Sequence, residues 1–212
     1  MGDAEPRPIA GVVLALTGLA QIVLLTLHPA PDAHDFAGML RSEAAARAIN
    51  AVVHGGFIAA LAVQLVCYAL LSARLGISRA PTLAGLVFFG MGVAFLIASL
   101  AIDGLIFPAL AQRFVMKSAA EQNSLRGIFA FTAATIGLLL PMGLSFQGAG
   151  LAGWSIRIFA ASRPTGVAAL AIAAAAFGAG ILAFTNPLFV FISIVAAALW
   201  AILAATFVLR RH

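Results

Sequence analysis

The chain has 212 residues, of which 63% are hydrophobic and only 9% are Asp, Glu, Lys or Arg. A soluble domain has about 45–50% apolar and about 25% charged residues, so this composition excludes an ordinary soluble globular fold. The net charge of +5 comes from basic residues that stand singly between apolar runs, which argues against nucleic-acid binding. We expect the chain to lie in a lipid bilayer, with its basic residues at the membrane surfaces.

Six apolar stretches reach the roughly 20 residues that a helix needs to cross a membrane. The predicted helices cover residues 9–27, 51–71, 82–107, 127–147, 165–184 and 187–209. Together they predict an all-α fold, a bundle of six transmembrane helices forming one transmembrane domain over residues 1–212. No cleavage site follows the first run, so we expect it to remain as an uncleaved helix.

The fourth apolar stretch is too long for a single crossing. No charge interrupts it between Gly127 and Arg157, which at ~1.5 Å per residue exceeds the ~30 Å hydrocarbon core. Pro141 should kink this helix, and the glycines between 148 and 153 should loosen its end. We therefore expect the helix to leave the membrane near Gln147, with Trp154 at the interface.

Two long connections, at 29–50 and 108–126, fall on the same side of the bundle, and each begins with proline. Each contains an amphipathic stretch that predicts a short helix in the headgroup plane. The first stretch combines Phe36, Met39 and Leu40 with Arg41, Glu43 and Arg47. The second combines Phe114 and Val115 with Arg113, Lys117 and Glu121.

The distribution of basic residues predicts the orientation, because cytoplasmic loops carry an excess of Lys and Arg. The side with short connections holds seven of them: Arg7, Arg74, Arg79, Arg157, Arg163, Arg210 and Arg211. The side with long connections holds five: Arg41, Arg47, Arg113, Lys117 and Arg126. The short side should be cytoplasmic, with both termini inside and both amphipathic segments periplasmic. A composition rich in Ala, Gly and Arg is typical of a GC-rich bacterial genome, so we expect a bacterial inner (plasma) membrane.

Small residues should mark the helix contacts, because lipid offers no hydrophobic drive between helices. The predicted contact positions are Ala174 with Gly178, Ala176 with Gly180, and the stripe Gly85, Gly92 and Ser99. Cys67 lies deep in an apolar run and is expected to be a small packing residue.

Ionisable groups inside a membrane are costly, and by default they mark functional sites. The topology brings four of them to the periplasmic end: His28, His34, His54 and Asp103. The spacings Asn50/His54 and Ser99/Asp103 are i,i+4 pairs, each on one side of a helix. Gln21 points into the same half of the membrane.

Three interpretations of this group remain open. It could be a hydrogen-bonded set that fixes helix register. It could be a binding or transport site built from His54, Asp103, Asn50, Ser99 and Gln21, with Asp103 as the proton or cation carrier. It could be a Zn or Cu site that uses His28, His34, His54 and Asp103.

The functional expectation is a non-enzymatic transporter-like, binding or accessory protein with a periplasm-facing polar pocket. The alternative is a metal-dependent membrane-embedded enzyme that uses the same cluster. No cofactor is predicted beyond Zn or Cu. The expected partners are the lipid bilayer and either a second copy of the chain or a larger membrane complex, with no nucleic acid.

Three sequence features support a resemblance to a group of proteins. They are the His28-Pro29 helix exit followed by an acidic loop, the histidine at position 54, and the stretch from Ile102-Asp103-Gly104 to Pro108-Ala109-Leu110-Ala111. On these residues the chain resembles uncharacterised small six-helix integral membrane proteins of GC-rich bacteria. The resemblance covers about the first 115 residues and implies no activity.

Overall fold

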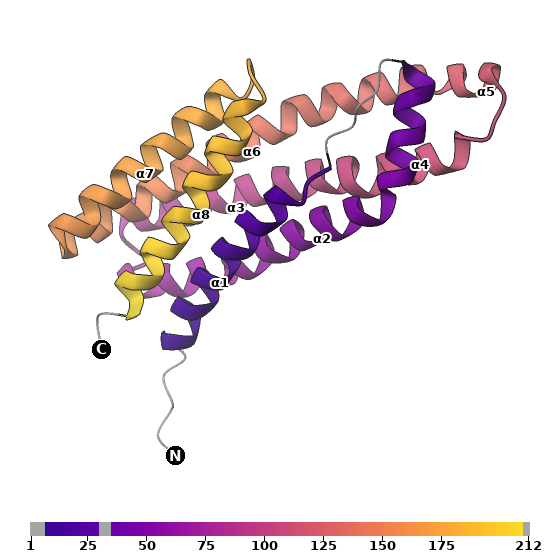
Figure 1. Cartoon of the computed structure of the whole chain (residues 1–212). Helices are drawn as coiled ribbons and strands as arrows, with labels where there is room; N and C mark the ends of the chain where they lie inside the picture. The colour runs from indigo at the N-terminus through magenta and orange to yellow at the C-terminus, as the bar shows by residue number, and fades with distance from the viewer. Residues whose placement is uncertain (1–6, 30–34, 210–212) are drawn as a thin grey trace.

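The computed structural model describes residues 7–29 and 35–209, and the described part is almost entirely helical (Figure 1). In chain order the elements are α1 (Arg7–Thr26), α2 (Phe36–Leu75), α3 (Ala80–Ala101), the π-helical turn η1 (Ile102–Ile106), α4 (Phe107–Phe114), α5 (Ala119–Ser124), α6 (Arg126–Ala161), α7 (Arg163–Leu182) and α8 (Leu188–Leu209). Within these residues, six continuous helical stretches are long and apolar enough to cross a membrane, as the sequence predicts.

The six long helices run side by side, and both ends of the described chain lie at the same end of the bundle (Figure 1). α1 packs along α8, and α6 packs against both α3 and α7. Near the chain ends, a Cβ added at Gly11 of α1 would lie 3.0 Å from Leu209 in α8. This arrangement agrees with an even number of crossings.

Glycines let α3 and α6 approach each other closely. A Cβ added at Gly92 would lie 2.7 Å from the carbonyl oxygen of Gly143, and one at Gly150 would lie 2.8 Å from that of Gly85. Contacts this short leave room only for hydrogen at these positions. The stripe predicted at Gly85 and Gly92 is confirmed as a contact face, and α6 supplies a matching one.

Of the two small-residue pairs predicted in α7, one makes a helix contact. Ala176 is buried and its carbonyl accepts the Ser193 hydroxyl at 2.9 Å, while a Cβ at Gly180 would meet the backbone of Ser145. The pair Ala174/Gly178 is wrong as a contact face, because Ala174 is exposed and nothing lies within 4 Å of a Cβ at Gly178.

The fourth predicted helix does not end near Gln147. α6 is helical through Pro141 and on to Ala161, and Trp154 is fully buried rather than interfacial. The glycines after Gln147 do not loosen the helix, because they contact neighbouring backbones. A Cβ at Gly148, for example, would lie 2.5 Å from Cα of Phe177 in α7.

The two amphipathic stretches are not separate helices in long loops, so the predicted boundaries at residues 51 and 108 are wrong. The first stretch forms the opening turns of α2, whose N-terminus is capped by Asp35. The second divides between α4 and α5. The start of α2 and the apolar face of α4 meet the beginning of α6 in a small second core: Leu40, Phe107, Ala111, Leu125 and Phe129. This mutual burial extends α2 beyond the length that a single crossing requires.

Candidate functional site

Three elements bring His28, His54 and Asp103 together. His28 follows the end of α1, His54 lies in α2, and Asp103 belongs to η1. One metal-ligand atom from each residue lies within 4.8 Å of the other two. His54 Nε2 is 3.2 Å from Asp103 Oδ2, and the two imidazole rings meet edge to face with centroids 5.0 Å apart.

The π turn that carries Asp103 has a local cause. Pro108 has no N–H for the carbonyl of Gly104, and its ring would crowd that carbonyl in a regular α-helix. The wider turn Ile102–Ile106, closed by the Phe107 N–H on the Ile102 carbonyl, accommodates the proline. π turns of this kind are frequent at functional sites.

Gly104 is the position where η1 touches His54. A Cβ added there would overlap Cγ, Cβ and Nδ1 of the His54 side chain. The imidazole therefore packs directly on the backbone next to Asp103. Any larger residue at 104 would displace the ring from the cluster.

Each imidazole of the pair uses its Nδ1 on a backbone carbonyl. His54 Nδ1 lies 3.0 Å from the Asn50 carbonyl oxygen, and His28 Nδ1 lies 2.9 Å from that of Pro29. A carbonyl only accepts, so Nδ1 carries the proton in both rings. In the neutral imidazole Nε2 is then a lone-pair donor, which is the arrangement that metal-binding histidines commonly have.

The contact between His54 Nε2 and Asp103 Oδ2 requires a proton or a cation between the two atoms. A neutral imidazole with its proton on Nδ1 and an ionised carboxylate would place two acceptors 3.2 Å apart. A proton on either group, or a bound cation, resolves the conflict. The His54 side chain is 2% exposed and that of Asp103 is 45% exposed, so Asp103 is the accessible partner of the contact.

The surroundings of His28 favour its neutral form. Burial lowers the pKa of this imidazole, and the positive charge of His54 lowers it further, while Asp103 and the bond to Pro29 raise it less strongly. The neutral ring is the form that binds a metal ion.

The cluster separates two cavities. The first, which we call the outer pocket, has a volume of about 250 Å³ and is lined by His28, Pro29, Ser42, Glu43, Ala46, Asn50, His54 and Asp103. The second, the inner chamber, has a volume of about 210 Å³ and extends between α1, α2, α3, α6 and α8. His28, His54 and Asp103 line both cavities, so they form the wall between a polar space and a mainly apolar one.

The other predicted site residues lie around this wall. The Asn50 carbonyl, rather than its amide, contacts His54, and the amide donates to Glu43 at 3.1 Å. Ser99 is buried and lines the inner chamber next to Asp103. Gln21 also lines the chamber. His34 lies outside the described residues.

Sequence reasoning missed three polar residues near the site. Gln64 exchanges amide hydrogen bonds with Gln21 at 3.0 and 3.4 Å, and both side chains are buried. A polar residue in the middle of an apolar run is the signal that could have found it. Gln147 lines the inner chamber, but α6 was expected to leave the membrane there. Glu43 was assigned to an exposed amphipathic stretch.

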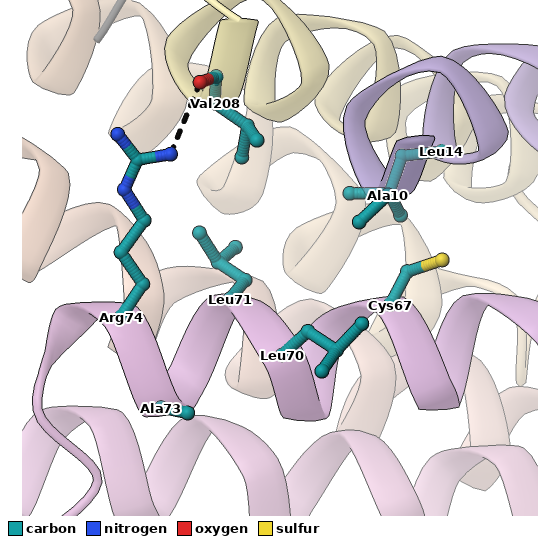
Figure 2. A pocket seen from close by; sticks show the side chains of 8 residues that line it. All are labelled: Ala10, Leu14, Cys67, Leu70, Leu71, Ala73, Arg74 and Val208. Atoms are coloured by element: carbon teal, nitrogen blue, oxygen red, sulfur yellow. Dashed lines mark hydrogen bonds between the residues drawn. The ribbon is translucent and has the colours of Figure 1, made fainter. Parts of the chain in front are cut away.

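A third cavity, of about 430 Å³, lies among α1, α2 and α8 near the chain ends, and its chemistry differs (Figure 2). Its lining residues include no histidine or carboxylate among those that the structure describes. Arg74 donates to the Val208 carbonyl at 3.0 Å, which neutralises the C-terminal end of α8. Cys67 is buried at this cavity and packs in the core, as predicted.

The fold and the site define a class: an all-helical protein with six helices fit to span a membrane and a His/Asp cluster between two cavities. No protein-family profile, curated protein or solved structure matches the chain.

Proposed function

We propose that the protein is a membrane protein that binds a transition-metal ion, Zn²⁺ or Cu²⁺, through His28, His54 and Asp103. The observation that carries this proposal is the convergence of three donors while both imidazoles use Nδ1 on carbonyls. A cation also resolves the conflict between His54 Nε2 and the Asp103 carboxylate. Imidazole and carboxylate donors suit Zn²⁺, and imidazole also suits Cu²⁺.

The donor spacing supports an ion of this size. Ligands at about 2.0–2.1 Å from a tetrahedral Zn²⁺ stand about 3.3 Å apart. His54 Nε2 and Asp103 Oδ2 are 3.2 Å apart, and the donor atoms of the cluster all lie within 4.8 Å of one another. His28 closes this difference with a shift of about 1.5 Å. His28 lies past the last residue of α1, so such a shift leaves the packing of that helix unchanged.

Three protein ligands leave one position of a tetrahedral ion for water or another molecule, as in catalytic rather than structural zinc sites. When bound, the ion would polarise whatever occupies that position. His34 remains a candidate for a further donor. We propose that the outer pocket faces the periplasm, in line with the excess of basic residues at the opposite end.

A second candidate function is transport of a cation or proton, with Asp103 as the carrier. The position of the cluster between two cavities favours it, because a carrier must be reached from both sides. Asp103→Asn should then abolish cation- or pH-dependent flux in liposomes. Unchanged flux in this variant would argue against transport.

The metal proposal can be tested on the whole chain in lipid nanodiscs. We expect one Zn²⁺ per chain by mass spectrometry of the metal, and a Kd by calorimetry that weakens more than about 100-fold in His54→Ala and in His28→Ala. The Kd of His34→Ala for Zn²⁺ shows whether a fourth side chain contributes to the site.

His212→Ala is the matched control. Residue 212 follows the end of α8 by three residues, which span at most ~11 Å, and that end lies opposite the cluster. The same affinity in wild type and His54→Ala, or no bound metal at all, would refute the proposed function.

A further inference from the structure

We infer that the inner chamber binds a small apolar monocarboxylate whose carboxylate group occupies the remaining position on the metal ion. This inference rests on the proposed function and names the class of ligand. It is drawn from three properties of the chamber: its walls, its volume and the charge at its polar end.

The walls of the chamber are mainly aliphatic and come from five helices. The apolar lining includes Phe57, Leu61, Leu96, Leu144, Val190 and Ile194. The polar lining is limited to Gln21, Ser99, Gln147 and the three cluster residues. A space with one polar end and apolar sides matches a ligand with one polar head and an apolar body.

The volume limits the length of that body. An apolar cavity of ~150 Å³ accommodates benzene. The chamber, at about 210 Å³, is larger by less than half. It therefore suits an apolar body of about eight carbons, either a short chain or a ring with a short substituent. A full-length lipid chain would fill this volume and extend out of the chamber.

The charge at the polar end selects an anionic head. A divalent ion with two neutral imidazoles and the single carboxylate of Asp103 keeps one net positive charge. Glu43 lines the outer pocket and not the chamber, so it does not fill the position on the chamber side. A buried charge is costly without a partner, so a carboxylate is preferred over a neutral or cationic head.

The metal is also the feature that makes anion binding possible here. Among the residues that the structure describes, the chamber's lining includes no lysine or arginine. Ser99 and Gln147 are buried at the lining and offer neutral donors to the second carboxylate oxygen. Without the ion, an anion would enter an apolar space with only neutral partners. Binding of the carboxylate should therefore depend on the metal.

The test uses radiolabelled octanoate with the full chain in nanodiscs loaded with Zn²⁺. We expect saturable binding of one octanoate per chain, loss of this binding after zinc is removed by chelation, and no competition by octylamine. Empty nanodiscs measure partition into lipid.

Two variants in α8 test whether the ligand lies in the chamber. Val190→Phe projects a ring into the chamber and should weaken octanoate binding at least 10-fold, with zinc content unchanged. Ile192→Phe is the matched control, because Ile192 is exposed and does not line the chamber, so it should bind as the wild type does.

The outcomes separate the two proposals. Zinc bound without saturable octanoate binding, or octanoate binding equal in Val190→Phe and wild type, overturns the inference and leaves the metal site standing. Octanoate binding that persists after chelation, or equal competition by octylamine, overturns the assignment of the head group to the ion. Absence of zinc overturns the proposed function itself.

Discussion

The two halves of the bundle treat their buried polar groups in opposite ways. Towards the end where α2 and α6 finish, an aromatic core joins Tyr68, Phe89, Trp154 and Trp200, with ring centroids 4.6 to 5.9 Å apart along the chain of contacts. Each indole N–H has a serine partner at 2.8 Å, Ser72 for Trp154 and Ser155 for Trp200. The aromatic rings pack closely in this half, and both indole donors are satisfied.

In the other half, the buried polar contact depends on a proton or a cation between its two atoms. His54 Nε2 faces a carboxylate, and cavities lie on both sides of the contact. A helix bundle gains packing from the first arrangement and not from the second. The aromatic half therefore holds the helices together, while under our proposal the histidine half binds a ligand.

The largest expected effect is on stability, in the aromatic half. Trp154→Ala removes a fully buried ring and leaves Ser72 without its indole partner, so the free energy of unfolding should fall by about 3–5 kcal/mol. Denaturation in bicelles measures the change. Zinc affinity should not change under conditions where the variant remains folded.

Phe131→Ala provides the control, because this ring is 74% exposed on the outer surface of α6 and its loss should change the unfolding free energy little. A folded Trp154→Ala variant that no longer binds zinc would show that the two halves are coupled. The comparison between them would then fail.

At Gly104 we expect a smaller effect, which falls on zinc affinity rather than on stability. Gly104→Ala pushes a methyl group into the His54 ring and should weaken zinc binding by about 10–100-fold, as changes that misorient a metal ligand do. Calorimetry gives the affinity, and thermal unfolding of metal-free protein reports on the fold. Gly127→Ala is the matched control, because nothing lies within 4 Å of a Cβ there. Equal zinc affinity in the two variants would mean that His54 does not need this contact.

Hydropathy was sufficient for the six helices and for the contact stripe at Gly85 and Gly92, because both are periodic local patterns. It failed where a distant partner decides the outcome. Trp154 looked interfacial because the α3 and α7 backbones that support the end of α6 are invisible in a linear sequence. In the same way, Phe36 looked like part of a surface helix because its partner Phe129 is remote in sequence, with ring centroids 5.5 Å apart.

The site shows the same division. The topology placed His28, His54 and Asp103 at one end, since helix count alone determines which ends coincide. Sequence spacing gave neither the Nδ1 hydrogen bonds nor the inner chamber. Those depend on the π turn before Pro108 and on the course of α6 beyond Gln147, which are results of packing.

The smallest expected effect concerns the paired amides of Gln21 and Gln64, close to the site. It tests whether this contact belongs to the aromatic half, which holds the helices together, or to the histidine half. Gln21→Leu and Gln64→Leu each leave one buried amide unpaired, so each should lower the unfolding free energy by about 1–2 kcal/mol. The double variant removes both amides and should lose less stability than either single variant, so the coupling energy should exceed about 1 kcal/mol.

Unfolding of the four proteins of this double-mutant cycle in bicelles gives the coupling energy, and zinc titration of the same samples gives the function. Unchanged zinc affinity in all four would assign the amide pair to structure, alongside the indole–serine contacts. A loss of zinc affinity in the double variant, with stability restored, would instead place the pair within the site. Leucines would then pack as well as the amides do. Only a role at the chamber wall would explain why the amides are kept.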